Sequence, residues 1–333
     1  MVFHPAIIAL LVGSVLISAM LCYSAYYGVR ILKSWNIRSG SELQLSLERR
    51  TYLISTMMTY AFGFQLVSLF LFIYTADHLH TLFIGAMCAA GSLNVNEFGY
   101  PTVILKTVNF ILAGLWLIIN FTDNRGYDYP LVKKKYLLLL LITPGIVAET
   151  IVQGKYFLGL EPDVITSCCG ALFSVNAEGV TSGIVSLPVL PVSASFYASM
   201  ALTLALGVYF YFKGQGAYLF SVANSVTFMV SIIALISYIS IYIYELPTHH
   251  CPFDILQAEY NFLGYPLYAS LFGSAVTGMG VGVIMPFKKI MSLRQVIPTV
   301  QRGLAVAALI LSTIFLSMAV YGVASSNLTL ALF

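Results

Sequence analysis

Long apolar runs alternate with short polar segments along the whole chain. Each run is long enough to cross the roughly 30 Å hydrocarbon core of a membrane as a helix, which takes about 20 residues. We therefore expect an all-α membrane protein surrounded by the lipid bilayer. The pattern predicts eight transmembrane helices, at residues 5–27, 52–75, 101–122, 136–157, 195–213, 217–244, 266–285 and 303–324.

Two copies of one short motif divide the chain into similar halves. The pattern Asn-x-x-Gly-Tyr-Pro stands at 96–101 and again at 261–266, each time directly before a long apolar run, and a cysteine precedes each copy. The two prolines, Pro101 and Pro266, are 165 residues apart in a chain of 333. This offset of almost half the length indicates an internal duplication.

The duplication predicts two four-helix repeats, one at 1–165 and one at 166–333. An even number of helices returns each repeat to the side where it began, so the repeats should be parallel and not inverted. The second repeat would start with a long, apolar outer loop at about 158–194. Exposed apolar segments are costly in water, so we expect this loop to pack over the bundle as a lid.

Basic residues separate the loops into two kinds. Fourteen of the sixteen Lys and Arg residues fall in the first, third, fifth and seventh loops. The positive-inside rule predicts that these loops are cytoplasmic and that both termini are periplasmic. The N-terminal run has no basic residue before it and no small-x-small cleavage pattern, so we interpret it as the first spanning helix and not as a signal peptide.

Composition excludes several classes of protein. With 59% hydrophobic and 9% charged residues, the chain has no room for a sizeable soluble domain. No histidine lies within the predicted spans, so paired axial ligands for haem b are not expected. The chain also lacks the Gly-x-x-x-x-Gly-Lys-Ser/Thr loop of nucleotide hydrolases, and nothing in it favours nucleic-acid binding.

The predicted outer face gathers side chains that bind soft metals. Thiolates and thioethers select Cu(I), and imidazole suits copper and zinc. The candidate ligands are Met87, Cys88, Cys168, Cys169, His249, His250 and Cys251. Our first hypothesis is a membrane component, more an accessory than an enzyme, whose periplasmic site handles a soft metal such as copper or docks a periplasmic metal-carrying or redox protein. Other membrane subunits are further candidate partners.

Two alternatives use the same cysteines. In an oxidising compartment they would form two disulfides of a structural anchor. A bond between the neighbours Cys168 and Cys169 is strained, so each would reach a different loop, one to Cys88 and the other to Cys251. Alternatively, Cys251-Pro-Phe-Asp254 has the shape of a Cys-x-x-Cys redox motif with Asp in place of the second thiol. With a thiol recruited from another loop, the protein would pass electrons between periplasmic thiols and a quinone.

Three segments carry a resemblance to a protein family. They are Ser-Leu-Glu-Arg-Arg-Thr-Tyr-Leu-Ile-Ser-Thr at 46–56, Gly-Ala-Met-Cys at 85–88, and His-His-Cys-Pro-Phe at 249–253. Together they resemble a family of bacterial polytopic inner-membrane proteins that has no assigned activity. The resemblance covers most of the chain. It implies a bacterial inner membrane and a setting of periplasmic metal or electron-transfer proteins, and it transfers no catalytic residue.

Two ionisable residues lie well inside the predicted spans, Lys106 and Glu149. At a rise of about 1.5 Å per residue, both are roughly 8 to 12 Å below the outer boundary, on consecutive helices. An isolated charge at that depth costs about 2.5 kcal/mol or more. We therefore expect the two side chains to form an ion pair, which would offer a polar element beneath the outer site.

Overall fold

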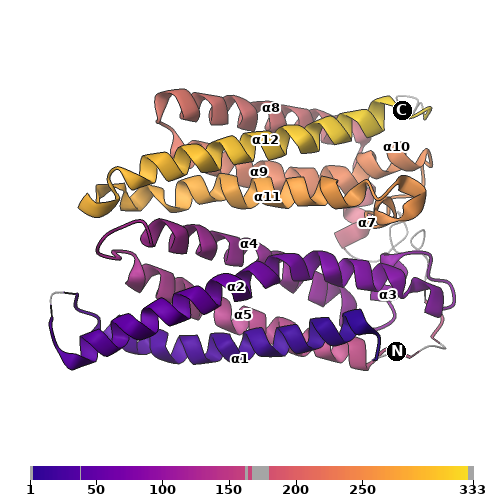
Figure 1. Cartoon of the computed structure of the whole chain (residues 1–333). Helices are drawn as coiled ribbons and strands as arrows, with labels where there is room; N and C mark the ends of the chain where they lie inside the picture. The colour runs from indigo at the N-terminus through magenta and orange to yellow at the C-terminus, as the bar shows by residue number, and fades with distance from the viewer. Residues whose placement is uncertain (1–2, 38, 162–163, 167–179, 329–333) are drawn as a thin grey trace. The chain divides into compact units, whose positions relative to one another are not determined.

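The computed structural model describes the chain except residues 1–2, 38, 162–163, 167–179 and 329–333 (Figure 1). Within this described part, eight helical segments are long and apolar enough to cross a membrane, which confirms the predicted number and makes the chain a multi-pass membrane protein. They are built on α1 (Pro5–Ser34), α2 (Glu42–His78), α4 (Gly99–Asp123), α5 (Val132–Leu158), α8 (Val189–Lys213), α9 (Ala217–Ala234), α11 (Gly264–Val283) and α12 (Val296–Ala324).

Several helices start before the predicted spans. Helix α2 begins at Glu42 and not at 52, α8 at Val189 and not at 195, and α12 at Val296 and not at 303. Hydropathy detects only the apolar part of a helix. The residues added to α2 include the charged Glu48 and Arg49. Those added to α8 and α12 include Pro191 and Pro298 in the first turn, where a proline is tolerated because the N–H that it lacks would have no partner within the helix.

The chain forms two compact units. The first contains residues 1–75, 96–160 and 283–301, and the second contains 76–95, 161–282 and 302–333. The segment 76–95, which carries Cys88, thus belongs to the second unit together with Cys251. The relation of the two units as parallel repeats, and the periplasmic side of the termini, stay predictions.

The core of the first unit lies where α5 packs against α1 and α4. Trp116 is buried there, with its ring 4.9 Å from that of Phe62. Its indole nitrogen donates to the carbonyl of Lys135 at 3.0 Å, which satisfies the polar end of the ring inside the bundle. Two short 3-10 turns, η5 (Met285–Lys289) and η6 (Met291–Leu293), complete this unit between α11 and α12.

The second unit contains an interrupted helix. Helix α8 packs against α9, and α9 passes into the π-helical turn η2 (Leu235–Ile239) before it ends as α10 (Ser240–Tyr244). A π turn alters the i to i−4 hydrogen-bond pattern and often lies at a functional site. The short helix α7 (Val180–Val185), which lies within the predicted lid, contacts η2. Residues 162–163 and 167–179 of that lid lie outside the described residues.

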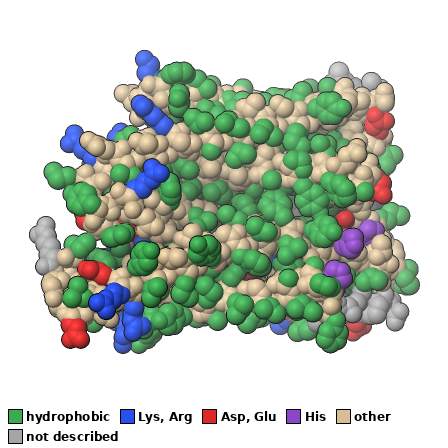
Figure 2. Space-filling model, in the orientation of Figure 1, with side chains coloured by type: hydrophobic (Ala, Val, Ile, Leu, Met, Phe, Trp, Pro, Cys, Tyr) green, Lys and Arg blue, Asp and Glu red, His purple; other side chains and the backbone are tan. Residues whose placement is uncertain are grey.

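Short elements lie in the loop between α2 and α4 and in the loop between α10 and α11. They are η1 (His80–Leu82), α3 (Ala89–Leu93), η3 (Asp254–Leu256) and η4 (Ala258–Tyr260). The flanks of the long helices are largely hydrophobic in the face that Figure 2 shows. Tyr60, Leu141 and Leu219 are among the exposed large side chains, at 76%, 67% and 66%. Such flanks fit contact with lipid and not with water.

Candidate metal centre

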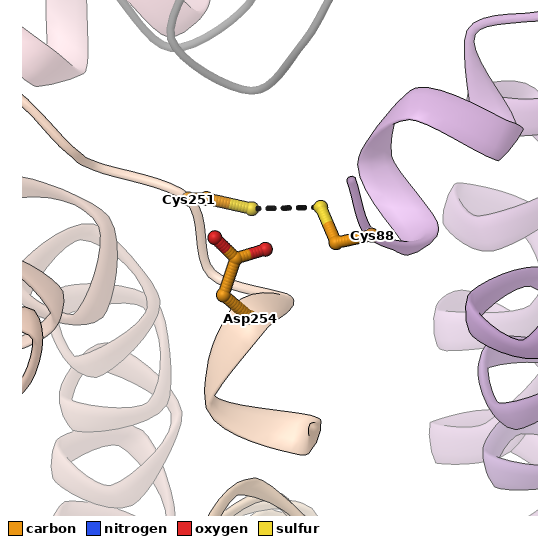
Figure 3. A group of neighbouring side chains, drawn as sticks. All are labelled: Cys88, Cys251 and Asp254. Atoms are coloured by element: carbon orange, nitrogen blue, oxygen red, sulfur yellow. Dashed lines mark hydrogen bonds between the residues drawn. The ribbon is translucent and has the colours of Figure 1, made fainter. Parts of the chain in front are cut away.

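Two cysteines that are far apart in the sequence meet in the second unit. The Sγ atoms of Cys88 and Cys251 lie 3.5 Å apart, and both side chains are fully buried (Figure 3). Cys88 directly precedes α3, and Cys251 precedes η3. A disulfide bond would bring the sulfurs to about 2.05 Å. The two sulfurs are therefore in contact without a covalent bond between them.

Asp254 completes a group of three ligand side chains. Its carboxylate lies with both sulfurs in a cluster whose ligand atoms are all within 4.8 Å of one another (Figure 3). The thiols of Cys88 and Cys251 hydrogen-bond to this carboxylate. From the sequence, Asp254 is predicted only as the residue in place of the second thiol of a Cys-x-x-Cys motif. The spacing of three residues between Cys251 and Asp254 could have indicated a shared site, because a tight turn places residues at this spacing side by side.

Two tyrosines, the buried Tyr244 and the half-buried Tyr268, hold the Cys251 loop in place. The hydroxyl of Tyr244 donates to the carbonyl of Cys251 at 2.6 Å and accepts the backbone N–H of Ile255 at 3.0 Å. The hydroxyl of Tyr268 donates to the carbonyl of Pro252. The backbone N–H of Phe253 points at the sulfur of Cys251 at 3.4 Å. These bonds fix the turn that aims Cys251 and Asp254 at one point.

A second set of bonds fixes the Cys88 loop. The carboxylate of Asp77, at the end of α2, accepts the backbone N–H of Ala89 at 3.1 Å. The amide of Gln257 donates to the same carboxylate at 3.3 Å and to the carbonyl of Met87 at 2.8 Å. Asp77 and Gln257 therefore join the Cys88 loop to the loop that carries Cys251.

Gly85 lets a further segment approach the Cys88 loop. Its φ is +88°, and a Cβ atom there would lie only 2.6 Å from the carbonyl oxygen of Thr166. Thr166 donates its N–H to Ile84 at 3.0 Å and its hydroxyl to the carbonyl of Gly91 at 3.0 Å. Only glycine accepts both the positive φ and the close backbone contact.

The two histidines of the motif turn in different directions. A ring nitrogen of His249 bonds to the carboxylate of Asp254 and thereby orients it. His250 instead donates from Nδ1 to the carbonyl of Ile236 in the π turn, at 3.0 Å. Neither histidine is in the three-residue cluster, although both were candidate ligands. The side chain of Met87 is 67% exposed, and Cys168 and Cys169 lie outside the described residues.

The electrostatics of the loop follow from burial and from these bonds. Burial raises the pKa of the Asp254 carboxyl, but the hydrogen bonds from His249, Cys88 and Cys251 outweigh it, so the pKa lies below its usual value. Burial lowers the pKa of His250, although backbone hydrogen bonds to Ile236 and Ser237 act in the opposite direction. At neutral pH the Asp254 carboxyl is therefore ionised, and the His250 ring, which faces the π turn, is neutral.

The first unit contains the pair of intramembrane charges. The Nζ of Lys106 lies 2.8 Å from Oε1 of Glu149, and both side chains are 1% exposed. The amides of Gln65 and Asn109 donate to Oε2 of Glu149 at 2.6 and 2.7 Å. Lys106 also donates to the hydroxyl of Ser68 at 3.2 Å. Three donors, from Lys106, Gln65 and Asn109, thus surround the side-chain carboxyl group of Glu149.

A second buried pair was missed because its members lie at the predicted span ends. The Nζ of Lys135 is 2.7 Å from Oδ2 of Asp123, at 1% and 0% exposure. Oδ1 of Asp123 accepts the backbone N–H of Leu131 at 2.7 Å. Basic and acidic residues near a boundary are expected to face water. The turn between α4 and α5 instead folds them inward.

Comparisons of this chain with family models, with curated proteins and with solved structures find no match.

Proposed function

We propose that Cys88, Cys251 and Asp254 bind a thiophilic metal ion such as Cu(I) or Zn(II). The observation that carries this proposal is the convergence of two buried sulfurs and one carboxylate, from loops 163 residues apart, within 4.8 Å of one another. Thiolates favour soft and borderline ions, and a carboxylate is a common additional ligand of zinc.

The sulfur separation fits a site with three or four ligands. Two sulfurs at about 2.3 Å from one ion are about 3.8 Å apart in a tetrahedral site and about 4.6 Å apart on opposite sides of a two-coordinate ion. The observed 3.5 Å is closest to the tetrahedral value. Binding would therefore need only a small outward shift of the two thiols.

The surrounding residues support such a site. Metal affinity depends on outer partners that hold the ligands in position. Here His249 orients Asp254, while Tyr244 and Gln257 fix the two loops. Cys168 and Cys169 stay candidates for a further ligand. In this proposal the protein is a non-enzymatic component of a bacterial inner membrane whose site faces the periplasm and exchanges the ion with a periplasmic metal carrier.

Metal analysis of the purified protein tests the proposal. Preparations made without chelators should contain one ion per chain, and Co(II) should give thiolate-to-metal charge-transfer absorption. Cys88→Ser, Cys251→Ser and Asp254→Asn should each lose or weaken binding. Cys22→Ser is the matched control, because Cys22 is an exposed cysteine of α1 in the first unit. A wild-type protein that binds no metal with its thiols reduced would refute the proposal.

The direct contact of the two sulfurs favours one rival, a redox-active dithiol. In that case the two thiols would form a disulfide and release two protons and two electrons, and a membrane quinone would take up both to become a quinol. Thiol labelling after rapid acid quenching distinguishes the two. A Cys88–Cys251 disulfide that is reduced by quinol and formed again by quinone supports the redox function, whereas two cysteines that labelling reagents reach only after chelation support the metal site.

A further inference from the structure

The second unit has a small cavity between its long helices, lined by both polar and apolar side chains. The cavity has a volume of about 10 Å³ for the centre of a water-sized sphere. Its polar lining comes from Asn224, Thr227, Ser274 and Ser312, and its apolar lining includes Met200 and Ala275. The residues come from α8, α9, α11 and α12, close to the middle of each candidate span. It is separate from the cysteine cluster and shares no residue with it.

Two groups of hydrogen-bonded side chains border this cavity. In the first, the hydroxyls of Thr203 and Thr227 are 2.8 Å apart, and Thr227 donates to the carbonyl of Ser199 at 3.1 Å. In the second, the hydroxyls of Ser274 and Ser312 are 2.6 Å apart. The amide of Asn224 belongs to the second group, 3.2 Å from the Ser274 hydroxyl. The cavity lies between the groups, because Thr227 lines it from one and the other three residues from the other.

We propose that this cavity binds one water molecule, which bridges the two groups. A cavity needs about 10 to 15 Å³ by this measure to hold a water, and the water needs two to four polar partners. Thr227, Asn224, Ser274 and Ser312 provide both donors and acceptors. No lining residue is anionic, so a cation there would lack a counter-charge in a low-dielectric interior. A neutral ligand that both donates and accepts is therefore the one that fits.

The bridge would join all four long helices of the second unit at one level. Hydroxyl groups buried among apolar side chains are costly when their hydrogen-bonding capacity is unused. The hydroxyls of Thr227, Ser274 and Ser312 each have a protein partner already, and a shared water would use their remaining hydrogen-bonding capacity without a large side chain. This is compatible with the close approach of α9 and α11. That approach depends on Gly278, because any side chain there would overlap the amide of Asn224.

Radiolytic hydroxyl-radical labelling of the intact protein in detergent, read by mass spectrometry, tests the proposal. X-rays generate radicals from water in place, so a buried residue next to bound water is modified. Met200 lines the cavity and is 2% exposed, whereas Met58 is 0% exposed and does not line it. We expect Met200 to be labelled several-fold faster than Met58. Equal protection of the two methionines in the wild-type protein would overturn the proposal.

Two variants and a control add to this test. Thr227→Val removes a bridging hydroxyl and Ala275→Val fills the cavity, so each should reduce labelling of Met200 toward that of Met58. Thr313→Val is the matched control, because its hydroxyl lies on α12 but is exposed and outside the cavity. Labelling of Met200 that is equal in sodium and choline buffers supports water. Labelling that changes with the sodium concentration would indicate that the cavity binds a cation and not water, and would overturn the assignment.

Discussion

The side-chain amide of Gln257 donates to the carboxylate of Asp77 at 3.3 Å and so connects residues 180 positions apart. The same amide holds the carbonyl of Met87, next to Cys88. Gln257→Ala should therefore loosen the Cys88 loop against Cys251. We expect metal affinity to fall about 10-fold to 100-fold, as for other outer partners of metal ligands. Competition titration with a coloured chelator measures the change. Gln295→Ala, at an exposed position, should leave the affinity unaltered.

Metal binding should strengthen as the pH rises. Two thiols must lose their protons to become ligands, so binding releases up to about two protons per ion. The low pKa of Asp254 means that its carboxylate is already ionised and adds no further proton. Affinity measured from pH 6 to 8 should thus rise by up to about 100-fold per pH unit. An affinity that does not depend on pH in this range would count against thiolate ligands.

We expect the loss of one member of the Lys106–Glu149 pair to destabilise the protein more than the loss of both charges. Lys106→Met leaves a buried carboxylate without its cation and should destabilise the protein by about 3 to 5 kcal/mol. Lys106→Met combined with Glu149→Gln removes both charges and should cost less. Thermal unfolding in detergent compares the two, with Lys155→Met at an exposed position as the control. Equal losses in the single and double variants would show that the pair is not a unit.

His250 predicts a stability that falls in mild acid. Burial holds its pKa in the folded protein below the value of about 6.5 in an unfolded chain. Below about pH 6.5 the unfolded chain binds a proton at this histidine while the folded protein does not, which favours unfolding. The free energy that neutral His250 contributes to the folded state is therefore present above about pH 6.5 and is lost as the pH falls toward the pKa in the folded protein. His250→Gln should reduce the decline in unfolding temperature between pH 7.5 and 5.5. His78→Gln, at an exposed histidine, should keep the full decline.

We expect even an alanine at position 278 to destabilise the protein. The Cβ of an alanine would overlap the amide of Asn224 across the α9–α11 contact. Gly278→Ala should destabilise the protein by about 1 to 3 kcal/mol, in spite of the better helix propensity of alanine. Gly303→Ala is the matched control, because a Cβ there meets no atom within 4 Å. A neutral Gly278→Ala variant would mean that Asn224 can move away freely.

The pattern of apolar runs was enough to predict the class of this protein and the eight long apolar helices found in the described residues. An apolar run of about 20 residues has few alternatives to a spanning helix, because its backbone must satisfy its own hydrogen bonds in lipid. The ion pair of Lys106 with Glu149 could also be predicted from the sequence, because these two charges lie at similar depth on consecutive helices. These inferences are local or depend only on depth.

The contacts among the loop residues around Cys88 and Cys251 could be found only from the folded structure. Cys88 and Cys251 lie 163 residues apart, and their contact depends on which unit the segment 76–95 joins, which no local pattern encodes. Asp254 is a candidate ligand because its turn places the carboxylate next to Cys88, which the sequence alone does not show. His250 is not in the cluster, because its ring hydrogen-bonds to the π turn. Spacing along the chain restricts near neighbours. The direction of a side chain across a loop depends on packing and hydrogen bonds supplied by distant residues such as Tyr244, Asp77 and Gln257.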